Sequence, residues 1–286
     1  MTQALINGLV LGANYALMAL GLTLIFALMG VLNFAHGQLY VLGGFVTYYV
    51  FTVMGLPFVV AVLASIVVLA IVGFLFDALF FRRVQQRSAR EESSMLLAAG
   101  LALLLESLIL LGFGEKQRGV ALSVSGVYQI FDAYVPASRV VVFVVAMLAV
   151  VLFILFMRHT KPGRVLRAIA QDRDVTALQG VNIALYSGVG FAIGSALAGL
   201  AGSLLVTIFA VNSGMGTAIS IKAFIMVMLG GAGIVSGAIV GAFVLGMVEA
   251  LGYAFLPGSV TYLVIFVGLI LFLVIRPNGI MGKPWG

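Results

Sequence analysis

Three hydrogen-bonding side chains interrupt an apolar stretch near the N-terminus. Asn33, His36 and Gln38 lie within GVLNFAHGQLYVLGG, residues 30–44, with hydrophobic runs on both sides. Together their amides and imidazole offer several donors and acceptors, which could bind the ammonium or carboxylate of a small polar solute. We predict that these three residues and Gly37 line a translocation pathway. The alternative is that they cap a helix end, or form a short loop between two spans, and satisfy one another.

Two carboxylates lie deep within apolar segments: Glu106 within residues 95–113 and Glu249 within residues 237–255. An unpaired carboxylate at the middle of a bilayer costs roughly 2 to 3 kcal/mol. We therefore expect both side chains to face the bundle interior or a cavity, and we assign them to the same pathway. Lys222 is a possible partner, but its long side chain favours reaching out to the outer interface. Asp77 is expected to pair with the two arginines that follow it.

Several chemistries are absent from the sequence. There is no cysteine, the two histidines lie in different segments, and no two carboxylates share a helix face. We therefore predict neither a metal site nor a cofactor, and an intramembrane enzyme is disfavoured. A phosphate-binding G-x-x-x-x-G-K-[ST] loop is also missing, because the only Gly-Lys pair, Gly282 and Lys283, is followed by proline. The chain is not expected to hydrolyse ATP by itself.

The composition indicates the elements that must position these residues. Hydrophobic residues make up 63% of the 286 residues and charged residues 8%, and the mean hydropathy is +1.26. Apolar runs reach about 20 residues, the length with which a helix crosses the hydrocarbon core, and they lack the alternation of a membrane β-barrel. We predict an all-α polytopic transmembrane helical bundle forming one domain over residues 1–286, without strands. The net charge of +6 indicates loops facing anionic lipid, not nucleic acid.

Nine apolar runs are candidate membrane spans. They cover residues 4–28, 31–54, 57–80, 95–113, 139–157, 186–210, 218–234, 237–255 and 259–275. The run at 218–234 contains a lysine and three glycines, so a broken or re-entrant segment is the alternative, which lowers the count to eight.

The orientation of the spans follows from the basic residues, which favour the cytoplasmic side. They are concentrated in three places: the loop with Arg82, Arg83, Arg87 and Arg90, the stretch 158–173, and the end of the chain with Arg276 and Lys283. This pattern predicts a cytoplasmic C-terminus and, for nine spans, an N-terminus outside.

Glycine is frequent, at 35 residues. Glycines and alanines spaced four apart, as at residues 190–202, let helices approach closely in lipid. Gly30 with Gly37 and Gly230 with Gly237 share a spacing of seven, which suggests an internal repeat of the kind found in transporters.

A polar, basic island, HTKPGRVLRAIAQDRDVTALQG, occupies residues 159–180. Its apolar residues from Val165 to Leu178 recur at spacings of three and four, which predicts one short amphipathic helix. Gly180 is suited to end it in a left-handed conformation. The polar face carries both signs of charge, which suits a protein partner better than a membrane surface. The alternative is a solvated helix between two spans.

Three blocks of the sequence resemble a known family. GRVLRAIAQDRDVTALQGVN, GLTLIFALMGVLNFAHGQLYVLGGF and SIKAFIMVMLGGAGIVSGAIVGAFVLGMVE are similar to the cytoplasmic coupling loop, an early segment and a late glycine-rich segment of permeases of branched-chain amino acid ABC transporters. The short chain is most similar to the LivH-type subunit. The resemblance implies a permease in the bacterial inner membrane that pairs with a second permease subunit, two cytoplasmic ATPase subunits and a periplasmic solute-binding protein.

The resemblance also assigns roles to residues of the island. It implies that ATPase coupling involves a group that includes both charged and small residues, namely Arg164, Arg167, Ala168, Gln171, Asp172 and Gly180. The implied solutes are branched-chain or similar hydrophobic amino acids, while amides, urea and aromatic acids would also suit apolar walls. A stand-alone proton-coupled carrier that uses Glu106, Glu249 or His36 stays open as an alternative.

Overall fold

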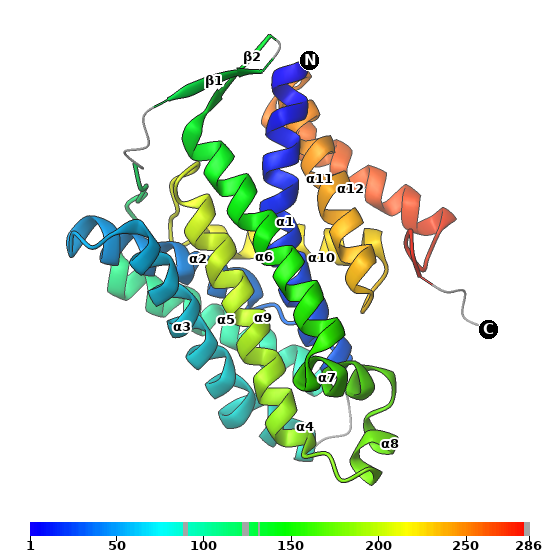
Figure 1. The fold of residues 1–286 in the computed structure, drawn as a ribbon. Helices are drawn as coiled ribbons and strands as arrows, with labels where there is room; N and C mark the ends of the chain where they lie inside the picture. The colour runs from blue at the N-terminus through cyan, green and yellow to red at the C-terminus, as the bar shows by residue number, and fades with distance from the viewer. Residues whose placement is uncertain (88–90, 122–125, 131, 283–286) are drawn as a thin grey trace.

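The helices of the bundle stand side by side in the computed structural model, which describes residues 1–87, 91–121, 126–130 and 132–282 (Figure 1). The elements, in chain order, are α1 (Thr2–Met29), α2 (His36–Tyr48), the π-helix η1 (Tyr49–Val53), α3 (Phe58–Phe76), the π-helix η2 (Asp77–Phe81), α4 (Arg82–Arg87), α5 (Glu91–Phe113), β1 (Val127–Ile130), β2 (Ala133–Pro136), α6 (Ala137–His159), α7 (Lys161–Gln171), α8 (Arg173–Leu178), α9 (Ile183–Leu205), α10 (Met215–Gly230), α11 (Val235–Phe255) and α12 (Gly258–Ile275). Arg90 and Lys283, used above to predict orientation, lie outside the described residues.

Seven helices within the described ranges are long and apolar enough to cross a membrane, which confirms the predicted polytopic helical bundle. They are α1, the continuous helix formed by α3, η2 and α4, then α5, α6, α9, α11 and α12. The two remaining predicted spans are shortened. The run 31–54 becomes helical only from His36, and the run 218–234 is the 16-residue helix α10. At 1.5 Å per residue, α10 is about 24 Å long, shorter than the hydrocarbon core.

α1 forms the centre of the bundle. Of its most apolar stretch, 89% is buried, compared with 11% for α12 and 22% for α5. It packs against α9 and α11, and α9 in turn packs against α3. Small residues allow these approaches, since Gly8, Gly12 and Gly21 of α1 all face backbone atoms of α9 or α11. The outer helices expose apolar side chains, as lipid or another membrane subunit requires.

The two short helices α2 and α10 begin in the same way and cross each other. Asn33 Oδ1 accepts a hydrogen bond from the amide of Ala35 at 3.1 Å, and Asn212 Oδ1 accepts one from the amide of Gly214 at 3.1 Å. Four residues after each asparagine comes a glycine, Gly37 or Gly216, and a Cβ added at Gly37 would overlap the carbonyl oxygen of Gly216. Gly37 of α2 and Gly216 of α10 therefore occupy equivalent positions in the two helices. The predicted correspondence between Gly37 and Gly237 is a different one, because Gly237 of α11 packs against Gly230, the last residue of α10.

One sequence prediction about the fold is wrong: the chain does contain strands. β1 and β2 form an antiparallel hairpin in which Val127 pairs with Pro136 and Ile130 with Ala133. The hairpin lies beside the N-terminus, at the end of the bundle opposite α7 and α8 (Figure 1), and the amide of Tyr134 donates to Gln3 Oε1 of α1 at 3.0 Å. The prediction considered only membrane-spanning strands, whereas a four-residue strand outside the spans satisfies its backbone locally.

Candidate functional site

The polar island forms two helices, not the single helix predicted. α7 ends at Gln171 and α8 begins at Arg173. The break lies at Asp172, whose backbone is extended and whose Oδ1 accepts from the amide of Val175 at 2.9 Å. Asp172 is thus the N-cap of α8, and such caps stabilise helix starts by satisfying a free amide. Gly180 has φ +79° just after the end of α8, which confirms the predicted left-handed ending.

The two helices bury different amounts of apolar surface. α7 is firmly seated, because Leu166 and Ile169 are 0% and 3% exposed, and Thr160 Oγ1 caps its start by accepting from the amide of Gly163. On α8, in contrast, Leu178 is 85% exposed and Val175 is 53% exposed. The break at Asp172 separates these two residues from the buried apolar residues of α7, with which the predicted single helix had grouped them. A large apolar side chain is thereby presented outside the membrane-spanning helices.

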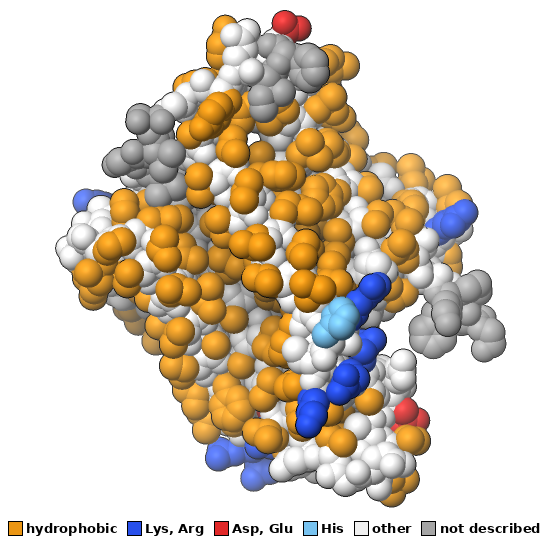
Figure 2. Space-filling view, viewed as in Figure 1, with side chains coloured by type: hydrophobic (Ala, Val, Ile, Leu, Met, Phe, Trp, Pro, Cys, Tyr) orange, Lys and Arg blue, Asp and Glu red, His pale blue; other side chains and the backbone are white. Residues whose placement is uncertain are grey.

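A groove of about 380 Å³ runs between α7 and α8. It brings together four of the predicted coupling residues, Arg164, Ala168, Gln171 and Asp172. Arg167 is exposed on α7 but does not line the groove. Gly180, which comes after the end of α8, does not line it either. Figure 2 shows Lys and Arg side chains gathered at the α7 end of the surface, below a belt that is mostly hydrophobic.

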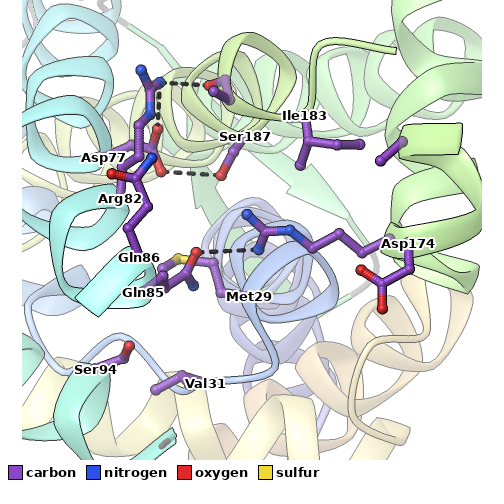
Figure 3. Close-up of a pocket in the computed structure, with 13 residues that line it drawn as sticks. Met29, Val31, Asp77, Arg82, Gln85, Gln86, Ser94, Asp174, Ile183 and Ser187 are labelled. Atoms are coloured by element: carbon purple, nitrogen blue, oxygen red, sulfur yellow. Dashed lines mark hydrogen bonds and ion pairs between the residues drawn. The ribbon is translucent and has the colours of Figure 1, made fainter. Parts of the chain in front are cut away.

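A second, larger cavity of about 820 Å³ lies behind α8, between α4, α9 and the end of α1 (Figure 3). Arg173 Nη1 of α8 donates to Gln85 Oε1 of α4 at 3.1 Å. Asp77 accepts from Arg82 Nη2 at 3.0 Å and from Ser187 Oγ of α9 at 3.0 Å, which confirms its predicted local pairing. These contacts connect α8, through α4 and η2, to the membrane-spanning helix α9.

Removing the arginine from this cluster should destabilise the bundle. Asp77 is 1% exposed, so Arg82→Met leaves its carboxylate buried with only Ser187 as partner. Because the Arg82 side chain is 29% exposed, we expect a loss of about 2 kcal/mol, less than for a fully buried pair. The measurement is the unfolding transition of the purified chain. The double variant Asp77→Asn with Arg82→Met should recover part of the loss, and equal stability of the single variant and the wild type would contradict this role.

One of the predicted pathway residues near α2, Gln38, contacts a carboxylate from α5. Gln38 Nε2 donates to Glu106 Oε2 at 3.0 Å, and Thr217 of α10 donates to the same oxygen at 3.4 Å. His36 Nε2 lies 3.1 Å from the carbonyl oxygen of Met18. In the described part of the protein, three buried polar atoms of this group have no hydrogen-bond partner: Asn33 Nδ2, His36 Nδ1 and Gln38 Oε1.

Glu249 belongs to a separate cluster. Its Oε1 accepts from Lys222 Nζ at 2.5 Å and its Oε2 accepts from Tyr15 Oη at 2.8 Å, while Lys222 Nζ also lies 3.1 Å from Tyr15 Oη. The expectation that Lys222 reaches the outer interface is therefore wrong. Thr217 and Lys222 are five residues apart on α10, about 140° around the helix, so the two glutamates lie on opposite sides of it.

Sequence reasoning missed the part played by Tyr15. The residue lies in the middle of α1, 207 residues from Lys222, and nothing in its local sequence distinguishes it from other aromatic residues in apolar helices. Tyr15, Lys222 and Glu249 contribute to the wall of a cavity of about 490 Å³.

Comparisons with known proteins match nearly the whole length of this chain. The family model described as "Branched-chain amino acid transport system / permease component" matches residues 4–275. The high-affinity branched-chain amino acid transport system permease protein LivH of Salmonella typhimurium is 32% identical over 298 residues, covering 99% of this chain and 96% of that protein. The corresponding protein BraD of Pseudomonas aeruginosa is 32% identical over 296 residues with the same coverage.

A solved structure supports the fold. PsaBC from Streptococcus pneumoniae in complex with Fab superposes with a TM-score of 0.52, at 16% sequence identity, over 97% of this chain and 92% of that one. At this identity the likeness concerns the arrangement of the helices alone.

Proposed function

The chain belongs to the family of permease components of branched-chain amino acid transport systems, and from this premise we propose that it is the membrane subunit through which an ABC importer of the bacterial inner membrane takes up branched-chain or related hydrophobic amino acids. The observation that carries the proposal is the match over residues 4–275, which covers the seven long apolar helices of the described residues except for the first two residues of α1. The chain is a multi-pass membrane protein and a transport subunit.

We propose that its partners are a second permease subunit, two cytoplasmic ATPases and a periplasmic solute-binding protein. The sequence has no phosphate-binding loop of its own, so the energy of ATP would reach it by contact. The largely exposed apolar surfaces of α5 and α12 offer area for a second membrane subunit as well as for lipid.

We place the ATPase contact at α7 and α8. Three features support this: the groove lined by Arg164, Gln171 and Asp172, the adjacent exposed Arg167, and the protruding Leu178 of α8. Interfaces commonly have an apolar anchor within a polar rim. Closure of the ATPases would move α8, and the contact between Arg173 and Gln85 would transmit that movement towards α9.

The solute pathway is proposed to pass the polar groups that the sequence singled out. Asn33, His36 and Gln38 retain unpaired polar atoms near the crossing of α2 and α10, with Gly37 keeping the backbones close. Glu106 contacts Gln38 and Thr217 at this crossing, whereas Glu249 contacts Lys222 on the other side of α10. Polar atoms buried inside the bundle without a partner favour a place that water or a polar solute can reach over contact with lipid.

The test is reconstitution in proteoliposomes. The chain, its co-expressed second permease and the ATPases should accumulate labelled leucine only when ATP is supplied on the ATPase side and loaded binding protein on the other. The chain reconstituted alone should accumulate none. Accumulation by the lone chain on a proton gradient would contradict the proposal and establish a secondary carrier.

A further inference from the structure

We propose that Lys222, Glu249 and Tyr15 form a recognition site for the charged head group of a free amino acid, with the carboxylate of the solute pairing with Lys222 and its ammonium with Glu249. The inference rests on the proposed function, because it locates within this chain where a zwitterionic solute would be bound during transport.

The three side chains come from three helices and form a closed set of contacts. Lys222 of α10 and Glu249 of α11 form an ion pair, and the Tyr15 hydroxyl of α1 donates to the carboxylate while it accepts from the ammonium. The ammonium also lies 5.6 Å and 5.2 Å from the ring centroids of Tyr15 and Tyr262, within reach of cation–π attraction. One cation and one anion are thus held side by side. They are complementary to the carboxylate and the ammonium of an amino acid head group, which also lie side by side.

The cavity beside this cluster fits an amphiphilic solute. Its volume of about 490 Å³ lies within the usual range for small-molecule sites, roughly 300 to 1,000 Å³. Apart from the ion pair, its wall is mainly aliphatic and aromatic, with Leu11, Met18, Leu205, Phe209 and Ile219 among its residues. A solute with a charged head and an apolar side chain would place each part against matching groups, whereas a second charge on the side chain would be left unpaired.

Two further cavities adjoin the one beside the cluster, because they share lining residues with it. A cavity of about 220 Å³, lined by Asn7 and Arg139, shares Leu11, Phe209 and Tyr253 with the main one. This cavity lies near the beginning of α1, where Arg139 also donates to Asn7. A third cavity, of about 110 Å³, shares Lys222, Glu249 and Tyr262 with the main one. The ion pair therefore borders both the cavity of about 490 Å³ and the cavity of about 110 Å³, where it could contact a solute that passes.

The ion pair itself calls for an explanation other than stability. Lys222 and Glu249 side chains are only 15% and 4% exposed, and an apolar pair of similar volume commonly stabilises a buried site at least as well. Ionisable groups within membrane spans are uncommon and mark solute pathways. A zwitterion can replace each partner of the pair in turn, so that no charge is left unpaired while the solute is bound.

The experiment uses the complete importer in proteoliposomes and compares Lys222→Met, Glu249→Gln and the double variant. Each single variant leaves one buried charge, whereas the double variant leaves none and should assemble with its partners. We expect the double variant to keep ATP hydrolysis stimulated by loaded binding protein but to lose at least tenfold in leucine uptake. Arg276→Met, at the exposed end of α12, is the control for removing one positive charge and should transport normally.

The outcomes separate two failures. If the wild-type importer itself takes up no leucine, the proposed function is wrong. If the wild type transports and the double variant transports equally well, the ion pair is structural only and the recognition site is wrong.

A second measurement covers the case in which the double variant does not assemble. Because the chain has no cysteine, Phe209→Cys introduces one thiol of this chain in the cavity wall, and its modification can be followed by the mass of this chain. Leucine should slow the modification several-fold in the complex during ATP turnover. 4-Methylpentanoate, which lacks the ammonium, should not. Equal rates with and without leucine would overturn the inference.

Discussion

Replacing Leu178 with aspartate should separate the permease from its ATPases and lower ATP-driven uptake by at least tenfold. Leu178 is 85% exposed at the end of α8, outside the apolar helices, so lipid does not account for its exposure. A hot-spot side chain at the centre of an interface costs about 2 kcal/mol or more when it is lost, and each 1.4 kcal/mol is tenfold in affinity. Because the side chain makes little contact within the chain, the variant should fold and insert normally.

Two variants serve as controls for Leu178→Asp. Leu178→Met keeps volume and hydrophobicity and should retain the ATPases. Leu256→Asp adds the same charge at an exposed apolar position in the turn between α11 and α12, and it should also retain them. The measurement is the amount of ATPase that co-purifies with a tagged chain, followed by uptake. Undiminished co-purification of Leu178→Asp would place the ATPase contact elsewhere.

Gly37→Val should prevent the chain from reaching its native packing. A Cβ at Gly37 would overlap the carbonyl oxygen of Gly216 and crowd the amide of Ser220, which are held by α10. The amide of Gly37 also donates to Ser220 Oγ at 2.9 Å, and that hydroxyl donates to the carbonyl oxygen of Phe34 at 2.8 Å. Backbone atoms cannot move aside as a flexible side chain can, so we expect a loss of more than about 3 kcal/mol, the upper end for overpacking.

The matched control for Gly37→Val is Gly100→Val. Gly100 lies within α5, and a Cβ there would meet nothing within 4 Å. Both variants are compared by size-exclusion chromatography of the solubilised chain and by thermal unfolding. Gly100→Val should elute and melt like the wild type, whereas Gly37→Val should aggregate or unfold at a much lower temperature. Equal behaviour of the two would mean that α2 and α10 do not cross at this glycine.

The sequence predicted those features that depend on neighbouring residues. Span positions follow from runs of apolar side chains, and seven of the nine predicted runs contain a long apolar helix. The pairing of Asp77 with Arg82 spans five positions, and the ending at Gly180 depends on one residue's backbone freedom. The two runs that formed shorter helices contain glycines and polar residues, but so do the runs 4–28 and 186–210, which formed long helices, so composition alone did not distinguish them.

The candidate site was only partly predictable. Arg164, Ala168, Gln171 and Asp172 were singled out and do line one groove, although their role stays a prediction. Periodicity alone could not reveal the kink at Asp172, because an aspartate within an amphipathic pattern also fits a continuous helix. Consequently the exposure of Leu178 was missed, and with it the strongest candidate for a docking contact.

What the sequence determined by itself is a multi-pass helical membrane protein, because hydropathy and local spacing are sums over adjacent residues, while the permease family followed from the resemblance of three sequence blocks. Only the tertiary structure decided that Lys222 turns inward to Glu249 and Tyr15, since these residues are brought together by the packing of α1, α10 and α11. A lysine near the end of an apolar run can reach either water or a buried carboxylate. The choice depends on whether a partner lies within hydrogen-bond distance, and that is a property of the folded bundle.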